Sequence, residues 1–211
     1  MGRLNSKTVE RLITYRRLLA SRAEGQSRHV FSHELAGLAR VSAAQVRRDM
    51  MEAGFSGSPS RGYDVDELLG RIDRLLDAPE GMKAVLVGVG NIGMALLSFL
   101  AGRGEKISVV AAFDNDPAKI DRVISGCRVY DIQTLPERVR TLGAQVGIVA
   151  VPEFQAKDAA DALVESGVTG ILNFAPVPLS VRTGVYVEQV DIMRAIEKVA
   201  HFAKQENARE V

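Results

Sequence analysis

The stretch Lys83-Ala-Val-Leu-Val-Gly-Val-Gly-Asn-Ile-Gly93 decides the fold of the larger part of this chain. Its apolar first half predicts a strand, and the run Met94–Ala101 that follows the glycines predicts a helix. A second predicted strand, Ile107–Phe113, ends at Asp114, roughly 20 residues after the last glycine, which is the spacing typical of the motif. Strand, glycine turn, helix and acidic strand end together match the βαβ unit that binds dinucleotides.

Each glycine of this turn has a physical role in the motif. Gly88 permits the tight turn, Gly90 lets the backbone approach a pyrophosphate, and Gly93 lets the helix pack closely on the strand. Free N–H groups at the start of the helix would then face the phosphates. Packing alone is the alternative explanation for a glycine-rich turn. The candidate cofactor-binding residues of the turn are Gly88, Val89, Gly90, Asn91, Ile92 and Gly93.

Asp114 indicates which cofactor the turn binds. A carboxylate accepts a hydrogen bond from the 2′-hydroxyl of NAD(H), but it repels the 2′-phosphate of NADP(H). The residues that follow immediately, Asn115 and Asp116, bring no positive charge. In the alternative interpretation Asp114 only caps the turn before Pro117, although Asp116 is better placed for that role. The sequence therefore predicts NAD(H) as the cofactor.

Charge is distributed unevenly along the 211 residues. Residues 1–61 contain eleven Lys or Arg and five Asp or Glu, whereas residues 62–211 contain sixteen and twenty-one. A basic first third on an acidic remainder is typical of a polyanion-binding module, with a merely solvated basic face as the alternative. The single Cys127 can form neither an internal disulfide nor a metal cage, which favours a reducing cytoplasm. No apolar stretch reaches membrane-spanning length, and the N-terminus has no secretory apolar core.

The basic N-terminal part has the pattern of a winged helix-turn-helix. Helices are expected over residues 6–24, from Ser32 as N-cap, and from Ser42 to Gly54, where Ser42 and Gln45 form a capping box. The short Arg40-Val41 connection has helix-turn-helix dimensions. A wing and a further helix follow, over Phe55–Tyr63 and from a second capping box at Asp64–Glu67.

From Met82 onward, strands and helices alternate as a parallel α/β sheet requires. Asp116-Pro117 can start a short helix. The other expected elements are strands at 128–130, 146–151, 170–174 and 185–190, and helices at 135–142, 153–166 and 191–206. The predicted fold class is α/β, in the order winged-helix domain (1–80), Rossmann-type domain (82–187) and C-terminal helix (188–211), with Ala78–Gly81 as the linker.

The helix from Ser42 is the candidate recognition helix. Val46 and Met50 are expected to pack inward, so that polar and basic side chains face the DNA. Gln can read adenine, Arg can read guanine, and both can hold phosphate. Arg61 on the wing suits a minor groove, and a solvated surface role is the alternative for each arginine. The candidate DNA-binding residues are Ser42, Ala44, Gln45, Arg47, Arg48, Arg61 and Gly62.

The sequence argues against an enzyme. Its three histidines are His29, His33 and His201, and two of them lie in the basic N-terminal region. No length remains for a substrate domain after the dinucleotide-binding unit. A dehydrogenase needs groups for proton and hydride transfer, so the cofactor is expected to be sensed and not consumed.

Taken together, the chain closely resembles the Rex family of bacterial redox-sensing transcriptional repressors. The resemblance covers nearly the whole chain, and several separate motifs occur in one order. They are Arg11-Leu-Ile-Thr-Tyr15, Val41-Ser-Ala-Ala-Gln-Val-Arg-Arg-Asp49, Arg61-Gly62-Tyr63, Gly88-Val-Gly-Asn-Ile-Gly93, Phe113-Asp114, Asn173-Phe-Ala-Pro176 and Val187-Glu-Gln-Val-Asp191.

The resemblance implies a homodimer whose C-terminal helices swap between partners. It also implies a repressor of genes for NADH reoxidation, which binds a palindromic operator when apo or NAD⁺-bound and releases it on NADH. By the same resemblance, Arg17 and Asp191 would couple the DNA-binding domain to the partner's nicotinamide site. The residues expected near the nicotinamide ring are Phe174, Ala175 and Pro176.

The chain departs from the family pattern in two places. Phe99 stands where the family often has a tyrosine, and the wing Ser58-Pro-Ser-Arg61-Gly-Tyr63 is shorter than usual. Two other functions remain open at this point. One is a small NAD-dependent oxidoreductase with a basic appendage. The other is a repressor whose Rossmann domain binds a different nucleotide, such as CoA, or serves only to dimerise.

Overall fold

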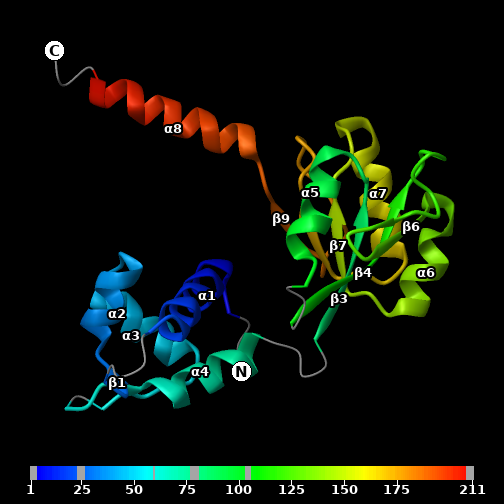
Figure 1. Cartoon of the computed structure of the whole chain (residues 1–211). Helices are drawn as coiled ribbons and strands as arrows, with labels where there is room; N and C mark the ends of the chain where they lie inside the picture. Colours follow the sequence, from blue (N-terminus) through cyan, green and yellow to red (C-terminus); the bar gives the residue numbers. More distant parts are fainter. Residues whose placement is uncertain (1–3, 23–26, 59, 77–80, 103–105, 208–211) are drawn as a thin grey trace. The chain divides into compact units, whose positions relative to one another are not determined.

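The computed structural model describes residues 4–22, 27–58, 60–76, 81–102 and 106–207. The chain divides into two compact units, Met1–Pro79 and Glu80–Val211, and both are drawn in Figure 1. All of the expected linker Ala78–Gly81 except its last residue lies outside the described residues, as do Pro59 of the wing and the expected end of the first helix.

The first unit packs short helices around one apolar core. Its elements are α1 (Ser6–Ala20), β1 (His29–Val30), α2 (Ser32–Ala39), α3 (Ala43–Glu52), β2 (Tyr63–Asp64) and α4 (Val65–Leu76). The side chains that this core excludes completely from solvent come from every helix and from β1: Leu12, Tyr15, Val30, Leu35, Val46, Met50, Leu68 and Ile72. The core therefore fixes α3 against α1 and α2.

Hydrogen bonds at the start of α1 and α2 determine where these two helices begin. Asn5 caps α1 through a hydrogen bond from the Thr8 N–H, 2.9 Å long. The expected cap at Ser32 is wrong, because Phe31 holds the cap position and its N–H donates to the carboxylate of Glu34 at 2.6 Å. Extended backbone at Phe31 lets β1 run directly into α2, which leaves Ser32 as the first helical residue.

The second unit is a parallel sheet with helices on both faces, in the strand order β5-β6-β4-β3-β7-β8-β9. Within the described residues of this unit, β5 is the one strand that pairs antiparallel, with β6. The strands are β3 (Met82–Val87), β4 (Ile107–Asp114), β5 (Val123–Ile124), β6 (Cys127–Asp131), β7 (Val146–Val149), β8 (Gly170–Asn173) and β9 (Tyr186–Gln189). The helices are α5 (Asn91–Leu100), η1 (Ile132–Thr134), α6 (Leu135–Leu142), α7 (Glu153–Glu165) and α8 (Ile192–Asn207).

Two apolar cores lie on opposite faces of this sheet. Val85 and Val87 of β3 pack into the cluster that contains Leu163 of α7. Leu86, the residue between them, packs into the other cluster with Leu97 of α5. Successive side chains of a strand point to opposite faces, so a continuous apolar run is what a strand buried on both faces needs.

Two details of the second unit differ from the sequence expectations. The expected helix at Asp116-Pro117 is a turn, because the chain reverses there to reach the two-residue strand β5. The helix after the glycines begins at Asn91 and not at Met94, with Gly90 as its N-cap. Among the described residues, no helix is both long and apolar enough to cross a membrane.

Strand order locates the place where a ligand can enter. β3 is hydrogen-bonded to β4 on one side and to β7 on the other. The chain therefore winds away from β3 in both directions, and β3 lies at the topological switch point of the sheet. A crevice opens at the carboxyl ends of the strands at such a point, and ligands of open α/β sheets bind there.

Candidate functional site

The glycine turn follows β3 at this switch point, and its three glycines are required for different reasons. Gly88 has a φ of +93°, and a Cβ there would lie 2.5 Å from the carbonyl oxygen of Ala150. A Cβ on Gly93 would lie 2.0 Å from the carbonyl oxygen of Gly88. Packing thus explains these two glycines. A Cβ on Gly90 would meet nothing within 4 Å, so packing does not explain the third glycine, and room for a ligand does.

Asp114 lies at the end of β4, beside this turn, and its carboxylate is almost fully used. Oδ2 accepts hydrogen bonds from the Val89 N–H at 2.7 Å and from Lys119 Nζ at 3.3 Å. Oδ1 accepts from the Asp116 N–H at 2.9 Å. Both carboxylates therefore serve the turn at Pro117, because Asp116 Oδ1 accepts from the Ala118 N–H at 2.9 Å, as its placement in the sequence suggested. Asp114 also fastens β4 to the glycine turn.

The electrostatics of Asp114 keep it ionised. Burial alone would raise its pKa, but the N–H groups of Asp116 and Val89 and the ammonium of Lys119 outweigh burial and lower the pKa overall. The side chain is 8% exposed. An anionic acceptor therefore stands in the wall of the crevice, where a ribose hydroxyl would reach it.

Lys119 is a residue that sequence reasoning missed. Its Nζ lies 3.3 Å from Asp114 and 3.5 Å from Asp116. The residues directly after Asp114 in the sequence carry no positive charge, but the turn folds a residue five positions later back onto the carboxylate. Two carboxylates against one ammonium leave a net negative charge, which still opposes a 2′-phosphate.

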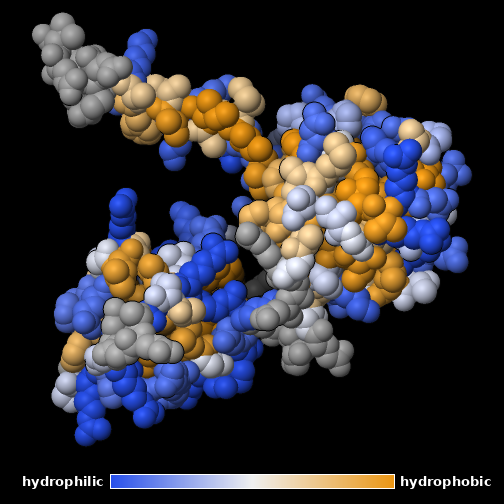
Figure 2. All heavy atoms as spheres, in the orientation of Figure 1, coloured by the Kyte–Doolittle hydropathy of each residue, from blue (hydrophilic) through white to orange (hydrophobic). Residues whose placement is uncertain are grey.

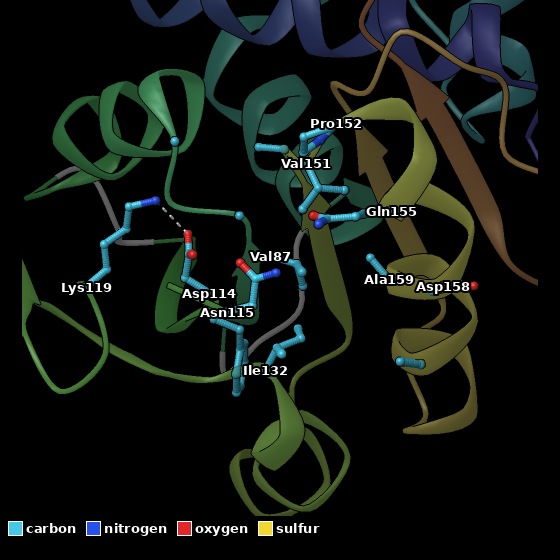
Figure 3. A pocket seen from close by; sticks show the side chains of 15 residues that line it. Val87, Asp114, Asn115, Lys119, Ile132, Val151, Pro152, Gln155, Asp158 and Ala159 are labelled. Carbon is cyan, nitrogen blue, oxygen red and sulfur yellow. Dashed lines mark hydrogen bonds and ion pairs between the residues drawn. The ribbon is translucent and has the colours of Figure 1, made fainter. Parts of the chain in front are cut away.

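A pocket of about 480 Å³ opens from the glycine turn and Asp114 (Figure 3). Gly88 and Gly90 line one part of it, and side chains of α7 line another. Its volume falls in the range of nucleotide and cofactor pockets. Figure 3 also shows the ion pair between Lys119 and Asp114 at the margin of this space.

Phe174, Ala175 and Pro176, the segment expected near the nicotinamide, are not part of the lining of this pocket. They follow β8, and Phe174 packs against the apolar cluster that contains Val89. Buried Asn173 holds the segment, because its Oδ1 accepts from the Ala175 N–H at 3.0 Å.

The same asparagine also ties the segment to β9. Its Nδ2 donates to Gln189 Oε1 at 2.7 Å, and Gln189 Nε2 donates to the Ala175 carbonyl at 2.9 Å. A pair of amides therefore determines the shape of the segment after β8. Sequence reasoning did not find it, although both residues lie in the quoted motifs.

The recognition helix α3 presents the side chains that the sequence selected. Val46 and Met50 are fully buried, whereas Ala44, Arg47 and Arg48 are exposed. Their separation follows from the helical period, with the apolar side of α3 packed in the core of the first unit. An exposed arginine face on a helix-turn-helix is suited to contact phosphates and bases.

Two polar residues of α3 also have structural roles. Ser42 caps the helix through a hydrogen bond from the Gln45 N–H, 3.1 Å long. The Gln45 side chain does not close the expected capping box, because its Nε2 donates to Asp49 Oδ1 at 2.8 Å. This bond occupies one of the two N–H donors of the Gln45 amide, which leaves its oxygen and one N–H for a base.

Asp49 is the centre of a buried network that the sequence did not reveal. Its carboxylate accepts from Arg11 Nε and Nη2, both at 2.7 Å, and from the hydroxyl of Tyr15 at 2.8 Å. Burial would raise the pKa of Asp49, but the hydrogen bonds from Arg11, Gln45 and Tyr15 lower it overall. The network joins α1 to the recognition helix.

The wing is a small hairpin beside the β1–β2 pair. Ser58 and Gly62 exchange backbone hydrogen bonds of 3.0 and 2.8 Å, and Arg61 between them is exposed. His29 and Val30 of β1 pair antiparallel with β2. Arg61 therefore extends from the described part of a short, folded wing, as expected.

The two coupling candidates lie in different units. Arg17 is exposed near the end of α1. Asp191 is the residue before α8, and its Oδ1 accepts from the Arg194 N–H at 2.8 Å, so it caps that helix. Phe99 is 58% exposed on α5. A contact between Arg17 and Asp191 stays a prediction.

These features together define a class of protein. A helix-turn-helix unit with an exposed arginine face precedes a parallel sheet whose glycine turn, acidic strand end and pocket suit a nucleotide. Such a chain is a DNA-binding regulator with a nucleotide-binding domain. Models of two protein families agree: "CoA binding domain" matches residues 80–177, and "Putative DNA-binding protein N-terminus" matches residues 5–50.

Curated relatives match nearly the full length. The redox-sensing transcriptional repressor Rex 2 of Enterococcus faecalis is 35% identical, over 92% of this chain and 91% of the relative. The redox-sensing transcriptional repressor Rex of Chloroflexus aggregans is also 35% identical, over 94% and 93%. The chain therefore belongs to the Rex family of redox-sensing transcriptional repressors. This is a family of repressors and not of enzymes.

Solved structures agree with this assignment. The crystal structure of RSP, a Rex-family repressor, has a TM-score of 0.87 at 25% identity, covering 100% of this chain and 98% of RSP. The structure of RSP in complex with β-NAD⁺ and operator DNA has a TM-score of 0.90 at 25% identity, covering 100% and 97%. A third structure holds RSP with β-NADH, at a TM-score of 0.85.

Proposed function

We propose that this chain represses transcription by binding a palindromic operator when it is apo or NAD⁺-bound, and that NADH binding releases the DNA. The observation that carries the proposal is the site at β3. Gly90 leaves room that packing does not require, and an ionised Asp114 stands beside it. In a Rex-family chain such a site suits a dinucleotide that reports the redox state.

NAD(H) is the ligand that the site favours. Asp114 and Asp116 outnumber Lys119, so the ribose end of the pocket carries negative charge that opposes a 2′-phosphate. RSP was solved with β-NAD⁺ and with β-NADH, which supports the same ligand here. CoA is the alternative, since a CoA-binding family model matches residues 80–177.

Operator DNA is proposed to bind the first unit, with Arg47 and Arg48 of α3 in the major groove and Arg61 of the wing in the minor groove. Ser42, Ala44 and Gly62 are proposed to lie at the same surface. All three arginines are exposed, and the first sixty or so residues carry the basic charge of the chain. Phosphate contacts release counterions, so affinity is expected to fall steeply with salt.

The proposed partner of α8 is a second copy of this chain. Its side chains are exposed throughout the described part of the helix, and Figure 2 shows hydrophobic residues along it. Large apolar side chains at this exposure favour association. They are Ile192, Met193, Ile196, Val199 and Phe202. A swapped helix in a symmetric dimer would cover them and would match a palindromic operator.

The proposed domain assignment follows from these roles: residues 1–80 bind DNA, 82–187 bind the dinucleotide, and 188–211 dimerise. Truncation after Gln189 should therefore give monomers or aggregate in light scattering. It should also lose operator affinity, because two half-sites are no longer engaged together. A truncated chain that stays dimeric would exclude the swapped helix.

Coupling between the two sites is the core of the proposal. A ligand shifts the DNA-bound state only through a difference in its own affinity for the two states. By reciprocity, operator DNA must weaken NADH binding by the factor by which NADH weakens operator binding. A useful redox switch needs a coupling of about 1–3 kcal/mol. Arg17 and Asp191 are proposed to transmit it.

A fluorescence titration of NADH with and without saturating operator tests the function. Operator should weaken NADH binding about 5- to 150-fold, which is the usual allosteric range, and should change NAD⁺ binding little. Asp191→Ala should keep operator binding and blunt its release by NADH. Parallel titrations with NADPH and CoA test the ligand. Identical NADH affinities in the two titrations would contradict redox sensing and leave a DNA-binding protein with an uncoupled site.

A further inference from the structure

The pocket continues past the residues that the dinucleotide motif explains. In a dinucleotide, the adenine follows the ribose, and the ribose follows the pyrophosphate. Gly88 and Gly90 mark the pyrophosphate end, and Asp114 marks the ribose. The motif does not account for a further part of the lining, which consists of Ile132 and residues of α7. If the proposed function holds, this part receives the adenine.

The walls of this part are apolar where a flat ring would lie. Phe113 and Ile132 come from β4 and η1, and Val151, Ala159 and Ala162 come from the loop and helix after β7. Apolar walls bind the faces of a purine but cannot tell one base edge from another. Any reading of the base therefore depends on polar side chains that reach the same space.

Two carboxamides line it from different elements. Asn115 follows Asp114 directly, and Gln155 lies in the first turn of α7, where its N–H is bonded to the carbonyl of Pro152 at 3.0 Å. In Figure 3 the two amides point toward the same space from opposite walls. Gln155 is half-buried there.

Neither amide is used by the protein itself. Within the part of the chain that the structure describes, no hydrogen bond is formed by the side-chain amide of Asn115 or of Gln155. Two amides away from the pocket, by contrast, have structural partners: Gln45 bonds Asp49, and Asn173 bonds Gln189. The two pocket amides are therefore available to a ligand.

We propose that Gln155 selects the base of the bound dinucleotide by hydrogen bonds to the polar edge of adenine, with Asn115 contributing from the opposite wall. This inference rests on the proposed function. At the edge that carries N6 and N1, adenine presents an amine donor beside a ring-nitrogen acceptor. A carboxamide presents an acceptor beside a donor. Gln155 can match both with one side chain, and Asn115 can bond a further ring nitrogen.

A carboxamide at this place predicts which modified bases the pocket accepts. Rotating a carboxamide by half a turn exchanges its donor and acceptor, so it can also match hypoxanthine, which has a carbonyl and a ring N–H at that edge. An etheno bridge across the amine and the adjacent ring nitrogen removes the amine donor and the ring-nitrogen acceptor and leaves one imine nitrogen as an acceptor. Either orientation of the amide can then form at most one of the two hydrogen bonds. Gln155 should therefore accept the hypoxanthine dinucleotide and reject the ethenoadenine dinucleotide.

Calorimetry on the full chain with three reduced dinucleotides tests the proposal. The unmodified protein should bind the ethenoadenine form about tenfold more weakly than NADH, and the hypoxanthine form within about threefold. Gln155→Met keeps the length of the side chain without its polar groups. It should shrink the ethenoadenine penalty to within about twofold. Gln133→Met, at an exposed glutamine outside the pocket lining, is the matched control and should leave the penalty unchanged.

Each outcome decides a separate point. A penalty that persists in Gln155→Met would mean that the pocket rejects the etheno ring by shape, which overturns the proposal. Equal binding of NADH and its ethenoadenine form by the unmodified protein would overturn it as well. A protein that binds none of the three dinucleotides would instead contradict the proposed function. Asn115→Ala should weaken NADH binding about threefold, and no change there would exclude the second amide.

Discussion

Among the described residues, each unit of this protein buries one aspartate, and the two are held in different ways. Asp49 in the first unit is fully buried, and its hydrogen bonds come from the side chains of Arg11, Tyr15 and Gln45. Asp114 in the second unit is 8% exposed, and two of its three hydrogen bonds come from backbone N–H groups. Both pKa values are lowered, so both groups are ionised.

The difference shows that a buried charge is not by itself a functional site. The charge of Asp49 is neutralised by a guanidinium from another helix, so it joins α1 to α3 and leaves nothing for a ligand. Backbone donors hold Asp114 without filling the space around it, and the carboxylate stays in the wall of a 480 Å³ pocket. A buried carboxylate that faces a guanidinium has a structural role, whereas one that faces a pocket can bind a ligand.

Asp49→Asn should have the largest effect, because it leaves the guanidinium of Arg11 without its counter-charge. Breaking a buried pair from one side costs about 3 kcal/mol, so the first unit should lose about that much stability. Urea unfolding of the full chain, with hydrogen exchange to assign the transition to the first unit, measures the loss. Glu67→Gln, in the exposed pair with Arg71, is the control and should cost below about 0.5 kcal/mol. A loss under 1 kcal/mol at Asp49 would mean that the network adds little.

Asp114→Asn should act on binding more than on folding. A neutral amide accepts more weakly from a ribose hydroxyl and no longer repels a 2′-phosphate, so the preference for NADH over NADPH should shrink about tenfold or more. Asp116 and Lys119 remain paired in this variant. Calorimetry with both cofactors measures the change, against Asp121→Asn in an exposed pair with Arg128. An unaltered preference would show that Asp114 serves only the turn.

Arg48→Ala should weaken operator binding by the first unit without changing NADH binding by the second. Loss of one exposed arginine from α3 should weaken operator binding about fivefold to tenfold and reduce its salt dependence, while NADH affinity stays the same. Arg140→Ala, at an exposed arginine of α6 in the second unit, should leave operator binding as it was. Fluorescence anisotropy with labelled operator makes both measurements. If the two variants bind operator alike, the DNA surface lies elsewhere.

Acid should weaken both units gradually, and this is the smallest effect. A carboxylate whose pKa is lowered by folding binds more protons when unfolded, so its stabilising contribution is present above about pH 4 and is lost below it. Between pH 5 and pH 3 the first unit should lose stability through Asp49, because folding lowers the pKa of this carboxylate. Asp49→Asn should flatten that part of the profile. A profile with the same slope in the variant would exclude Asp49 as its cause.

Much of the architecture could be predicted from residues whose constraints are local. The glycine turn of Gly88 to Gly93 needs particular backbone conformations, and the buried pattern of Val46 and Met50 follows the helical period. Lys119 could not be found in this way, because the turn that returns it to Asp114 depends on how β5 pairs with β6. The bond from Gln45 to Asp49 could not be predicted either, because the amide of Gln45 can donate equally well to a base or to a carboxylate.

The sequence by itself determined the order of the two units, the βαβ turn, the arginines of the recognition helix and the acidic strand end. Each of these depends on residues close together in the chain, where periodicity and backbone preference act directly. Tertiary structure alone decided which polar groups are already used. Asp49 accepts hydrogen bonds from Arg11 and Tyr15, which lie more than thirty positions away in the sequence, whereas Gln155 and Asn115 face a pocket. A hydrogen bond needs two groups in contact, and only the folded chain brings them together.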